Sequence, residues 1–280
     1  MTSTHVWKLR ASEIGALLGR NKYTSTSEAV AGVFERHFKV RWQRAKDAAR
    51  VEDPAILGRA ALRSCGAAKQ AIADAIRAAT PETTSDALQC VHQHILHAHD
   101  GHLTRARRKL VEPVAKAATD VARRLIYTEI GKHKEDAGLD AHARATGRKV
   151  GRRNDSFYKL EGPGYVVWGM IDGYDESTRT VIEHKQRQNR LFRGMPAYER
   201  VQCFLYMKMT DSARATLVQT WGEDQSSFQV AWDDAEWEQI ALGIDEAVQN
   251  LEQLRTDPAT RVELARAVYP PIPSTPPAGR

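Results

Sequence analysis

The pattern of apolar and polar residues changes along the chain, and the segments typical of β-strands lie in its C-terminal half. Residues 165–171 are an apolar, β-prone run and residues 180–185 are a second β-prone run, and the polar residues 175–179 lie between them. This order predicts a β-hairpin with its turn at 175–179. Residues 213–221 and 228–232 predict two closing strands.

Apolar residues at helical spacing predict helices on both sides of these strands. Ser12 and Ser27 are candidate N-caps of two early helices, because a serine side chain accepts hydrogen bonds from the first backbone N–H groups of a helix. Later helices are predicted over residues 131–145, 196–210 and 237–254.

Residues 40–128 are rich in Ala, Arg and Lys and are interrupted by turn signals. They predict roughly three or four amphipathic helices, inserted as a lid or an arm. Their basic cluster at residues 105–109 is either a solvated helix face or a phosphate contact. An α/β core would then comprise residues 1–39 and 129–256, and residues 257–280 a Pro-rich, disordered tail.

Composition narrows the function only slightly. The chain of 280 residues has 41 Lys and Arg against 35 Asp and Glu, a formal net charge of +6, which suits a polyanionic partner and plain solubility equally well. The sequence has no apolar run of membrane-spanning length and no secretory leader pattern. Its 3 cysteines favour a reducing compartment and are too few for a four-cysteine iron–sulfur cluster in one chain. We therefore expect an intracellular protein, cytoplasmic or nuclear.

Candidate chemistry lies on the predicted hairpin. Because strand side chains alternate between faces, Glu183 and Lys185 share one face and His184 points to the other. Asp172, at the end of the first predicted strand, can approach the same point. Two carboxylates beside one ammonium group suit Mg²⁺ acting on a phosphodiester. A surface hairpin with an ordinary Glu–Lys pair explains the same residues, because Asp-Gly is a common turn dipeptide.

These residues resemble the signature of a known family. Asp172, Glu183 and Lys185 match the Asp…Glu-X-Lys pattern of the PD-(D/E)XK nucleases, although Ile171 stands in place of the proline that names the motif. Three further stretches are similar to the branch of lambda exonuclease and the YqaJ-like viral recombinases, and they occur in the family's order. They are Ala11–Ile14 with Leu17–Gly19, Gly131–Ala137 with Thr146, Gly147 and Val150, and Ala197, Tyr198, Val201, Gln202, Tyr206 and Met207.

The resemblance implies a restriction-endonuclease-like fold, in which a mixed β-sheet is flanked by helices, and a metal-dependent deoxyribonuclease. It also implies a metal site. Asp172, Glu183 and the backbone carbonyl of His184 would hold Mg²⁺, or Mn²⁺ in its place. Glu135, on the helix that contains the second stretch, would join the metal shell.

The resemblance further implies that Lys185 positions the attacking water and that Gln202 supports Lys185. The implied activity is 5′→3′ exonuclease digestion of duplex DNA in recombination or replication. Such enzymes form ring trimers and act beside a single-strand annealing protein. Two alternatives stay open: a structure-selective or nicking endonuclease of the same fold, and a catalytically dead protein that binds DNA or a partner.

Candidate DNA contacts are polar and basic residues near these motifs. Relatives place an arginine several residues before the serine that matches Ser12, whereas Arg10 lies only two residues before it and Lys8 four. The pocket for a terminal phosphate is therefore not carried over. We predict contacts with DNA by Ser12, Arg10, Arg152, Arg153, Arg187 and Arg190.

The predicted insertion also contains a histidine-rich run at residues 92–102. His94 with His97, or His99 with His102, could hold a transition metal on one helix face and make the insertion a zinc-dependent regulatory arm. A plain polar helix face explains the same spacing. The insertion could also block or remodel the channel that accepts a DNA end.

Overall fold

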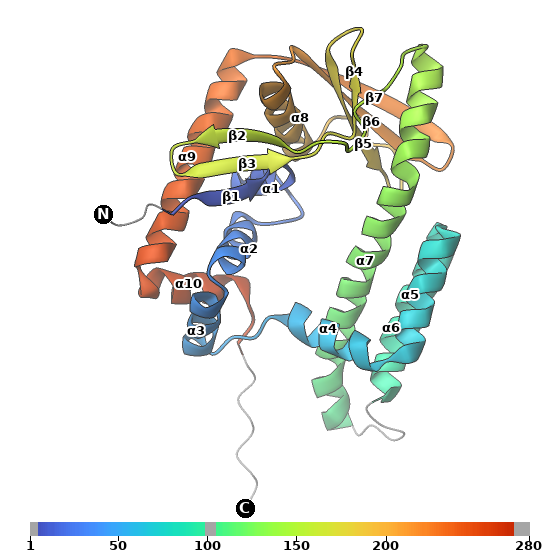
Figure 1. The fold of residues 1–280 in the computed structure, drawn as a ribbon. Coiled ribbons are helices and arrows are strands. Elements are labelled where there is room, and N and C mark those ends of the chain that lie inside the picture. Colours follow the sequence, from blue (N-terminus) through green and yellow to red (C-terminus); the bar gives the residue numbers. More distant parts are fainter. Residues whose placement is uncertain (1–4, 99–104, 272–280) are drawn as a thin grey trace, which may run out of the picture. The chain divides into compact units, whose positions relative to one another are not determined.

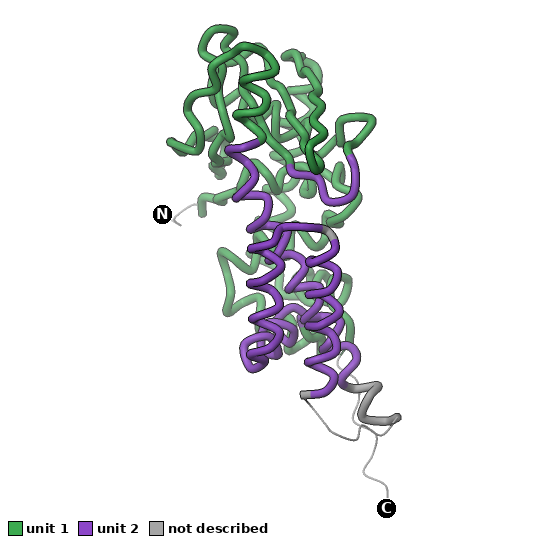
Figure 2. Tube along the Cα trace, turned by 90° about the vertical axis from the view of Figure 1, so that its right-hand side faces the viewer, with its two compact units in different colours: residues 1–52, 138–185, 191–280 green, residues 53–137, 186–190 purple. Residues whose placement is uncertain are grey.

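The computed structural model describes residues 5–98 and 105–271. The chain divides into two compact units, which Figure 2 shows in different colours. Unit 1 comprises Met1–Glu52, Gly138–Lys185 and Leu191–Arg280, and unit 2 comprises Asp53–Ala137 and Gln186–Arg190. No described helix combines the length and the apolar character needed to cross a membrane.

The strands form two sheets, seen as arrows in Figure 1. In the first, with the order β1-β3-β2, the central strand runs parallel to β1 and antiparallel to β2, so the sheet is mixed. In the second, with the order β4-β5-β6-β7, β4 is antiparallel to β5 and β6 to β7. Together with the helices, these sheets confirm the predicted α/β class. The strands are β1 (Trp7–Arg10), β2 (Tyr158–Gly162), β3 (Tyr165–Gly169), β4 (Gly173–Asp175), β5 (Thr180–Gln186), β6 (Arg214–Trp221) and β7 (Asp224–Ala231).

The hairpin prediction is right in its turn and second strand and wrong in its first strand. Asp175 fixes the turn, because its carboxylate accepts hydrogen bonds from the backbone N–H of Ser177 (2.9 Å) and the hydroxyl of Thr178 (2.7 Å). The partner of β5 is the short β4, whereas β3 belongs to the other sheet. The apolar run 165–171 contains no signal that the chain leaves one sheet after Gly169 and enters the next.

Helices surround the sheets of unit 1, and their caps differ from the predicted ones. β1 leads directly into α1, so Arg10 rather than Ser12 is the N-cap. Ser25, in a capping box, caps α2 in place of Ser27. The helices of this unit are α1 (Ala11–Leu17), α2 (Thr26–His37), α3 (Lys39–Ala49), α8 (Ala197–Thr210), α9 (Asp234–Thr256) and α10 (Pro258–Val268).

Two of these helices lie where we predicted other structure. Residues 258–268, which we placed in the tail, form α10 instead, because Asp257 caps the helix and Ala265 is buried in the core. α10 packs against α3. α3 covers the start of the predicted insertion, but it belongs to unit 1, where Trp42 is buried.

Unit 2 is helical in its described part, as the sequence of the insertion indicates. Asp53 caps α4 and Pro54 occupies its first turn, so the Asp-Pro pair, one of the turn signals in the predicted insertion, marks the start of a helix. Gly131 does not begin a helix as predicted, because α7 starts before it and continues to the predicted end at Thr146. A single glycine inside a helix costs only about 1 kcal/mol, so it does not interrupt α7. The unit contains α4 (Pro54–Ser64), α5 (Gly66–Ala78), α6 (Pro81–Ala98) and most of α7 (Arg105–Thr146).

Parts of three predictions fall outside the described residues. One of them is the predicted disordered tail, whose residues 272–280 the structure does not describe. His99 and His102 are among the residues that the structure does not describe, and so are the side chains of the basic cluster at 105–109. The backbone of that cluster forms the first turns of α7.

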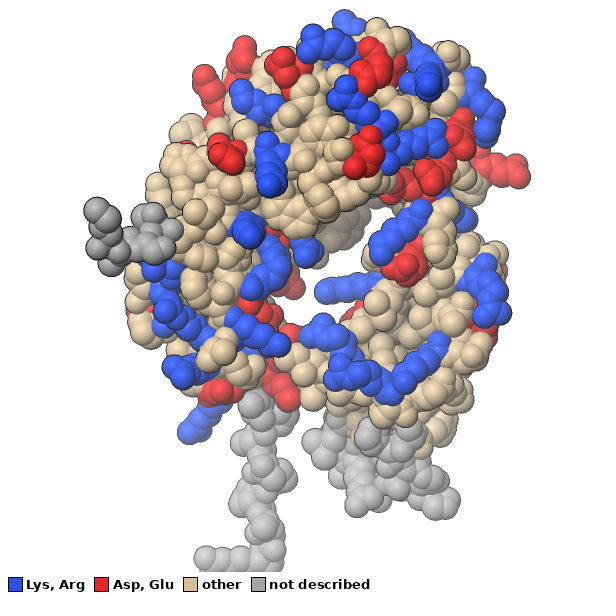
Figure 3. All heavy atoms as spheres, in the orientation of Figure 1, with Lys and Arg blue, Asp and Glu red and all other residues tan. Residues whose placement is uncertain are grey.

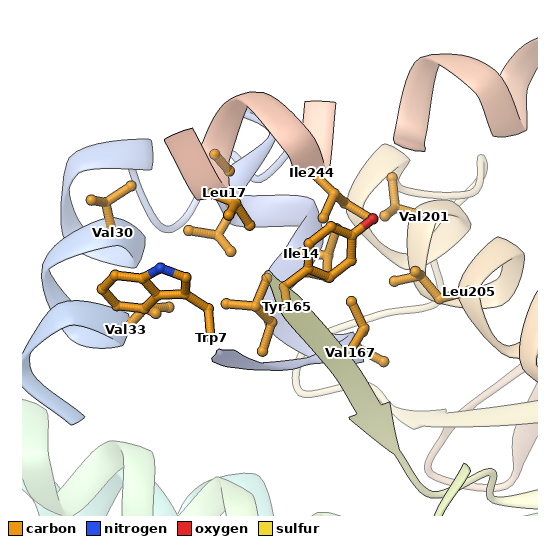
Figure 4. Close-up of a cluster of buried hydrophobic side chains, with 14 of the residues drawn as sticks. Trp7, Ile14, Leu17, Val30, Val33, Tyr165, Val167, Val201, Leu205 and Ile244 are labelled. Carbon is orange, nitrogen blue, oxygen red and sulfur yellow. The ribbon is translucent and has the colours of Figure 1, made fainter. Parts of the chain in front are cut away.

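The core of unit 1 lies between the inner face of the β1-β3-β2 sheet and the helices beside it. Figure 4 shows Trp7 and Val167 from the sheet gathered with Ile14 of α1, Val201 of α8 and Ile244 of α9, and all of them are buried. Burying such side chains is the main favourable contribution to folding. This packing holds α8 against the sheet that precedes Asp172 in the chain.

Gly15 allows α1 to cross α8 closely, because a Cβ at this position would lie 2.6 Å from the Cβ of Tyr198. We expect Gly15→Ala to destabilise the protein by about 1–3 kcal/mol, the usual cost of overpacking. Gly32→Ala on α2 is the matched control, since nothing lies within 4 Å of that Cβ position. It should stabilise the protein by up to about 1 kcal/mol. Urea unfolding measures both, and equal stability of the two variants would contradict the close crossing.

Candidate active site

Asp172 lies where the chain passes from the first sheet to the second. Its Oδ2 accepts a hydrogen bond from the backbone N–H of His184 at 2.7 Å. Gly173 pairs with Ile182 in the antiparallel β4–β5 ladder, so the same register places Asp172 beside Glu183. The carboxylate is therefore held at the start of β4 by the backbone of β5.

Glu183 and Lys185 lie on one face of β5 and form an ion pair between Glu183 Oε1 and Lys185 Nζ. Glu183 is buried, at 1% exposure, whereas the Lys185 side chain keeps 29% of its surface accessible. The pair thus combines a buried carboxylate with a lysine side chain that keeps part of its surface accessible. This is the cluster of Asp172, Glu183 and Lys185 that we predicted around one point.

His184 points to the opposite side of β5, as the strand alternation predicts. Its Nε2 lies 2.9 Å from the hydroxyl of Thr220 on β6. The imidazole also fills the space beside Gly138, where an added Cβ would lie 2.1 Å from the His184 Nε2 atom. The side chain is therefore structural, and only the backbone of His184 faces the cluster.

α8 brings a second row of buried polar side chains to the cluster. Glu199, Gln202 and Tyr206 lie at helical spacing and are all buried. The Glu199 carboxylate interacts electrostatically with the Lys185 ammonium. Gln202 donates a hydrogen bond to the hydroxyl of Tyr206 at 3.3 Å. The support that Gln202 would give to Lys185 stays a prediction.

Sequence reasoning missed Glu199. The residue lies three positions before Gln202 and seven before Tyr206, so all three share one helix face, and this spacing could have identified it. An isolated glutamate in the first turn of a helix is usually exposed and interacts with the helix dipole, which is why its burial is not evident from the sequence.

The charges of the cluster shift one another's protonation. Burial, and after it the nearby Glu183 carboxylate, raise the pKa of the Asp172 carboxyl to about 7 against the opposing effects of the Lys185 ammonium and the His184 N–H. Burial alone would lower the pKa of Lys185, but the carboxylates of Glu183 and Asp172 raise it above its ordinary value. Lys185 is therefore a cation in the metal-free site.

The donor set fits a hard divalent cation. The carboxyl groups of Asp172 and Glu183 lie together in a desolvated place, where the Glu183 carboxylate raises the pKa of Asp172. Mg²⁺ would favour the ionised form of both and needs only one or two carboxylates besides water and phosphate. Asp172, Glu183 and the His184 carbonyl are the groups of this chain that would hold it.

A site built from side chains alone, as zinc requires, is not evident. Within residues 5–98 and 105–271, no group of three or more His, Cys, Asp and Glu side chains is arranged to hold a metal ion. In the histidine-rich run, His97 Nδ1 lies 2.8 Å from the carbonyl of Gln93, and His92 Nε2 lies 3.1 Å from a Glu112 carboxylate oxygen. These contacts are those of a polar helix face.

The predicted DNA contacts are scattered over the two units. Ser12 and Arg10 are exposed at the start of α1. Arg152 is paired with Glu176 (2.5 Å) and stacks on Tyr174, and Arg153 is paired with Asp140 (2.7 Å), so phosphate would have to compete with these carboxylates. The remaining predicted residues, Arg187, Arg190 and the metal-shell candidate Glu135, belong to unit 2.

Comparisons with known proteins find similar chains among solved structures. A scan against models of protein families finds no match, and neither does a search of curated proteins. The chain is similar to a phage-related exonuclease from Haemophilus somnus 129PT, with 12% identity and a TM-score of 0.46, over 90% of this chain and 96% of that one. It is also similar to an alkaline exonuclease from Laribacter hongkongensis, with 14% identity and a TM-score of 0.36, over 55% and 86% of the two chains.

The raised pKa of Asp172 predicts a pH-dependent stability. In the absence of divalent ions, the folded protein keeps a proton that the unfolded chain releases between about pH 4 and 7, so its stability falls as the pH rises through this range. We expect Asp172→Asn, measured in EDTA, to be more stable than the parent at pH 8 by on the order of 1–3 kcal/mol. The difference should vanish near pH 4.

Asp175→Asn is the matched control. Burial would raise the pKa of Asp175, but hydrogen bonds from Ser177 and Thr178 outweigh it and lower the pKa, so the carboxylate stabilises the fold when ionised. This variant should be less stable than the parent at pH 8. Urea unfolding at both pH values decides the matter. An Asp172→Asn variant no more stable than the parent at pH 8 would show that the carboxyl is not strained by its neighbours.

Proposed function

We propose that this protein is a Mg²⁺-dependent deoxyribonuclease that hydrolyses phosphodiester bonds. The observation that carries the proposal is the hydrogen bond that ties Asp172 to β5, the strand with the buried Glu183 and its ion-pair partner Lys185. The four sequence stretches that resemble the PD-(D/E)XK nucleases support the same activity. Mn²⁺ is expected to substitute for Mg²⁺, because both prefer oxygen ligands.

The roles follow from the charges of the site. When bound, the divalent ion supplies polarisation of the phosphodiester and lowers the pKa of a water molecule. Asp172 and Glu183 would bind it through their carboxylates, and His184 through its backbone carbonyl. Lys185, kept cationic by the carboxylates around it, would orient the water and stabilise the negative charge that develops on the phosphorane.

The proposed reaction is an in-line displacement. The water oxygen forms a bond to phosphorus as the bond from phosphorus to the 3′ oxygen breaks. The proton of the water passes to solvent, and the leaving oxygen takes up a proton as the 3′-hydroxyl. The products are a 5′-phosphate and a 3′-hydroxyl. Gln202 would hold the α8 side of the site in place through its hydrogen bond to Tyr206.

We further propose exonuclease digestion of duplex DNA in the 5′→3′ direction, in recombination or replication. This finer proposal rests on the sequence resemblance, and so do a ring trimer, a single-strand annealing partner and the role of Glu135 in the metal shell. An endonuclease of the same fold, selective for structure or making nicks, is the alternative. Both use the same chemistry, and they differ in whether a free end is needed.

Substitutions in the cluster test the activity. We expect Lys185→Ala and Asp172→Ala to slow Mg²⁺-dependent degradation of linear duplex DNA by at least about 100-fold, the usual loss when an electrostatic stabiliser is removed. The matched controls are Lys208→Ala on α8 and Asp211→Ala just after it, both exposed. They should digest DNA like the parent. If the two cluster variants also keep the parent rate, the site lies elsewhere.

The need for an end separates the two proposed modes. We expect a linear duplex with labelled ends to be degraded progressively, whereas a covalently closed circle of the same sequence stays intact, because an exonuclease has no entry point on it. Gel analysis over time with Mg²⁺ follows both substrates. Nicking or linearisation of the circle at a comparable rate would establish the endonuclease instead.

A further inference from the structure

The outer face of the β1-β3-β2 sheet carries an aromatic side chain between two cations. Strand register places Arg10 of β1, Trp168 of β3 and Lys159 of β2 side by side in one row across the sheet. Lys8 follows on β1, on the same face as Arg10, and Glu161 is the acidic residue of this face on β2. Arg10, Lys8 and Lys159 are exposed.

This face is not the one that builds the core. The alternate residues of the same strands, among them Trp7, Leu9 and Val167, are buried against the helices of unit 1, and Figure 4 shows Trp7 and Val167 in that core. In Figure 3, which keeps the orientation of Figure 1, basic side chains lie among uncharged surface over this sheet. The outer residues are therefore available to a ligand.

A second aromatic ring extends the row. Phe157, just before β2, is 63% exposed, and its ring centre lies 5.6 Å from that of Trp168 in an edge-to-face arrangement. The Arg10 guanidinium lies 5.8 Å from the centre of the Trp168 ring. The row therefore offers two neighbouring aromatic rings with several cations around them.

The combination selects the chemistry of the ligand. Aromatic rings offer stacking to unpaired nucleobases, and Lys and Arg offer contacts to the phosphates between them. A duplex offers phosphates but keeps its bases stacked inside. A protein partner would favour apolar residues around the rings, whereas here the rings are bordered by Lys8, Arg10 and Lys159.

We propose that this face, formed by Lys8, Arg10, Phe157, Lys159 and Trp168, binds single-stranded DNA by stacking its bases on the two rings. The proposal rests on the proposed function, because a nuclease that removes one strand of a duplex leaves the other strand single. Trp168 lies four residues before Asp172, so the face is within about 14 Å of the proposed reaction centre along the chain. A strand held here would stay close to the site of cleavage.

Binding of a labelled single-stranded oligo-dT to the full-length protein in EDTA, measured by fluorescence anisotropy, tests the proposal without cleavage. We expect Phe157→Ala to weaken binding of the oligo-dT at least about 5-fold, because stacking on one ring is lost. Phe157→Trp should restore binding. An abasic oligonucleotide of the same length should bind the parent and Phe157→Ala equally, since it offers phosphates alone.

Trp221→Ala is the matched control, because Trp221 is exposed at the end of β6 in another sheet. It should bind the oligo-dT like the parent. If Phe157→Ala does the same, or if its loss is equal for the abasic oligonucleotide, the stacking surface is refuted. Failure of the parent to bind the oligo-dT while it forms dimers or trimers through this face would also overturn the proposal.

The outcome is separable from that of the proposed function. If the parent degrades duplex DNA with Mg²⁺ but Phe157→Ala binds the oligo-dT like the parent, the proposed nuclease stands and the stacking face is refuted. If the parent binds the oligo-dT through Phe157 but hydrolyses no DNA, the stacking face stands and the proposed nuclease is refuted.

Discussion

The hydrogen bond from the backbone N–H of His184 to the Asp172 carboxylate is the constraint on which the site depends. It ties Asp172, which follows the β1-β3-β2 sheet in the chain, to β5 of the second sheet. The Asp172 carboxylate is thereby placed beside the Glu183–Lys185 ion pair. Because a backbone group donates the bond, the Asp172 carboxylate is positioned without the use of another side chain of the cluster. The packing of α8 on the inner face of the first sheet completes it.

The cluster places two carboxyl groups together where there is little water. Glu183 is buried, and burial together with Glu183 raises the pKa of Asp172. Buried charge of one sign is unfavourable for the folded protein unless a counter-ion compensates it. The proposed divalent cation would supply such a counter-ion. The same property of Asp172 that weakens the metal-free fold would then favour the proposed activity.

The sequence predicted the residues of the candidate site better than it predicted which strands pair with each other. Alternation along β5 placed Glu183 with Lys185 and turned His184 away, and the polar turn at 175–179 was evident from its residues. The run 165–171 hid the passage between two sheets, because all its residues except Gly169 are typical of a buried strand. β1 and α10 were missed because each is short and is stabilised by packing: Leu9 and Ala265 are both buried. Glu199 looked like an exposed glutamate, and only tertiary packing buries it.

A crystal structure with Mn²⁺ bound, read from its anomalous signal, tests the metal site most directly. We expect one ion held by the carboxylates of Asp172 and Glu183 and the backbone carbonyl of His184. An ion at this position would show that the residues brought together by β4 and β5, among them Asp172 with its raised pKa, form the metal site of the proposed hydrolysis. An ion bound away from these three residues at saturating Mn²⁺, with Asp172 still bonded only to the backbone of β5, would contradict a catalytic centre at this strand pair.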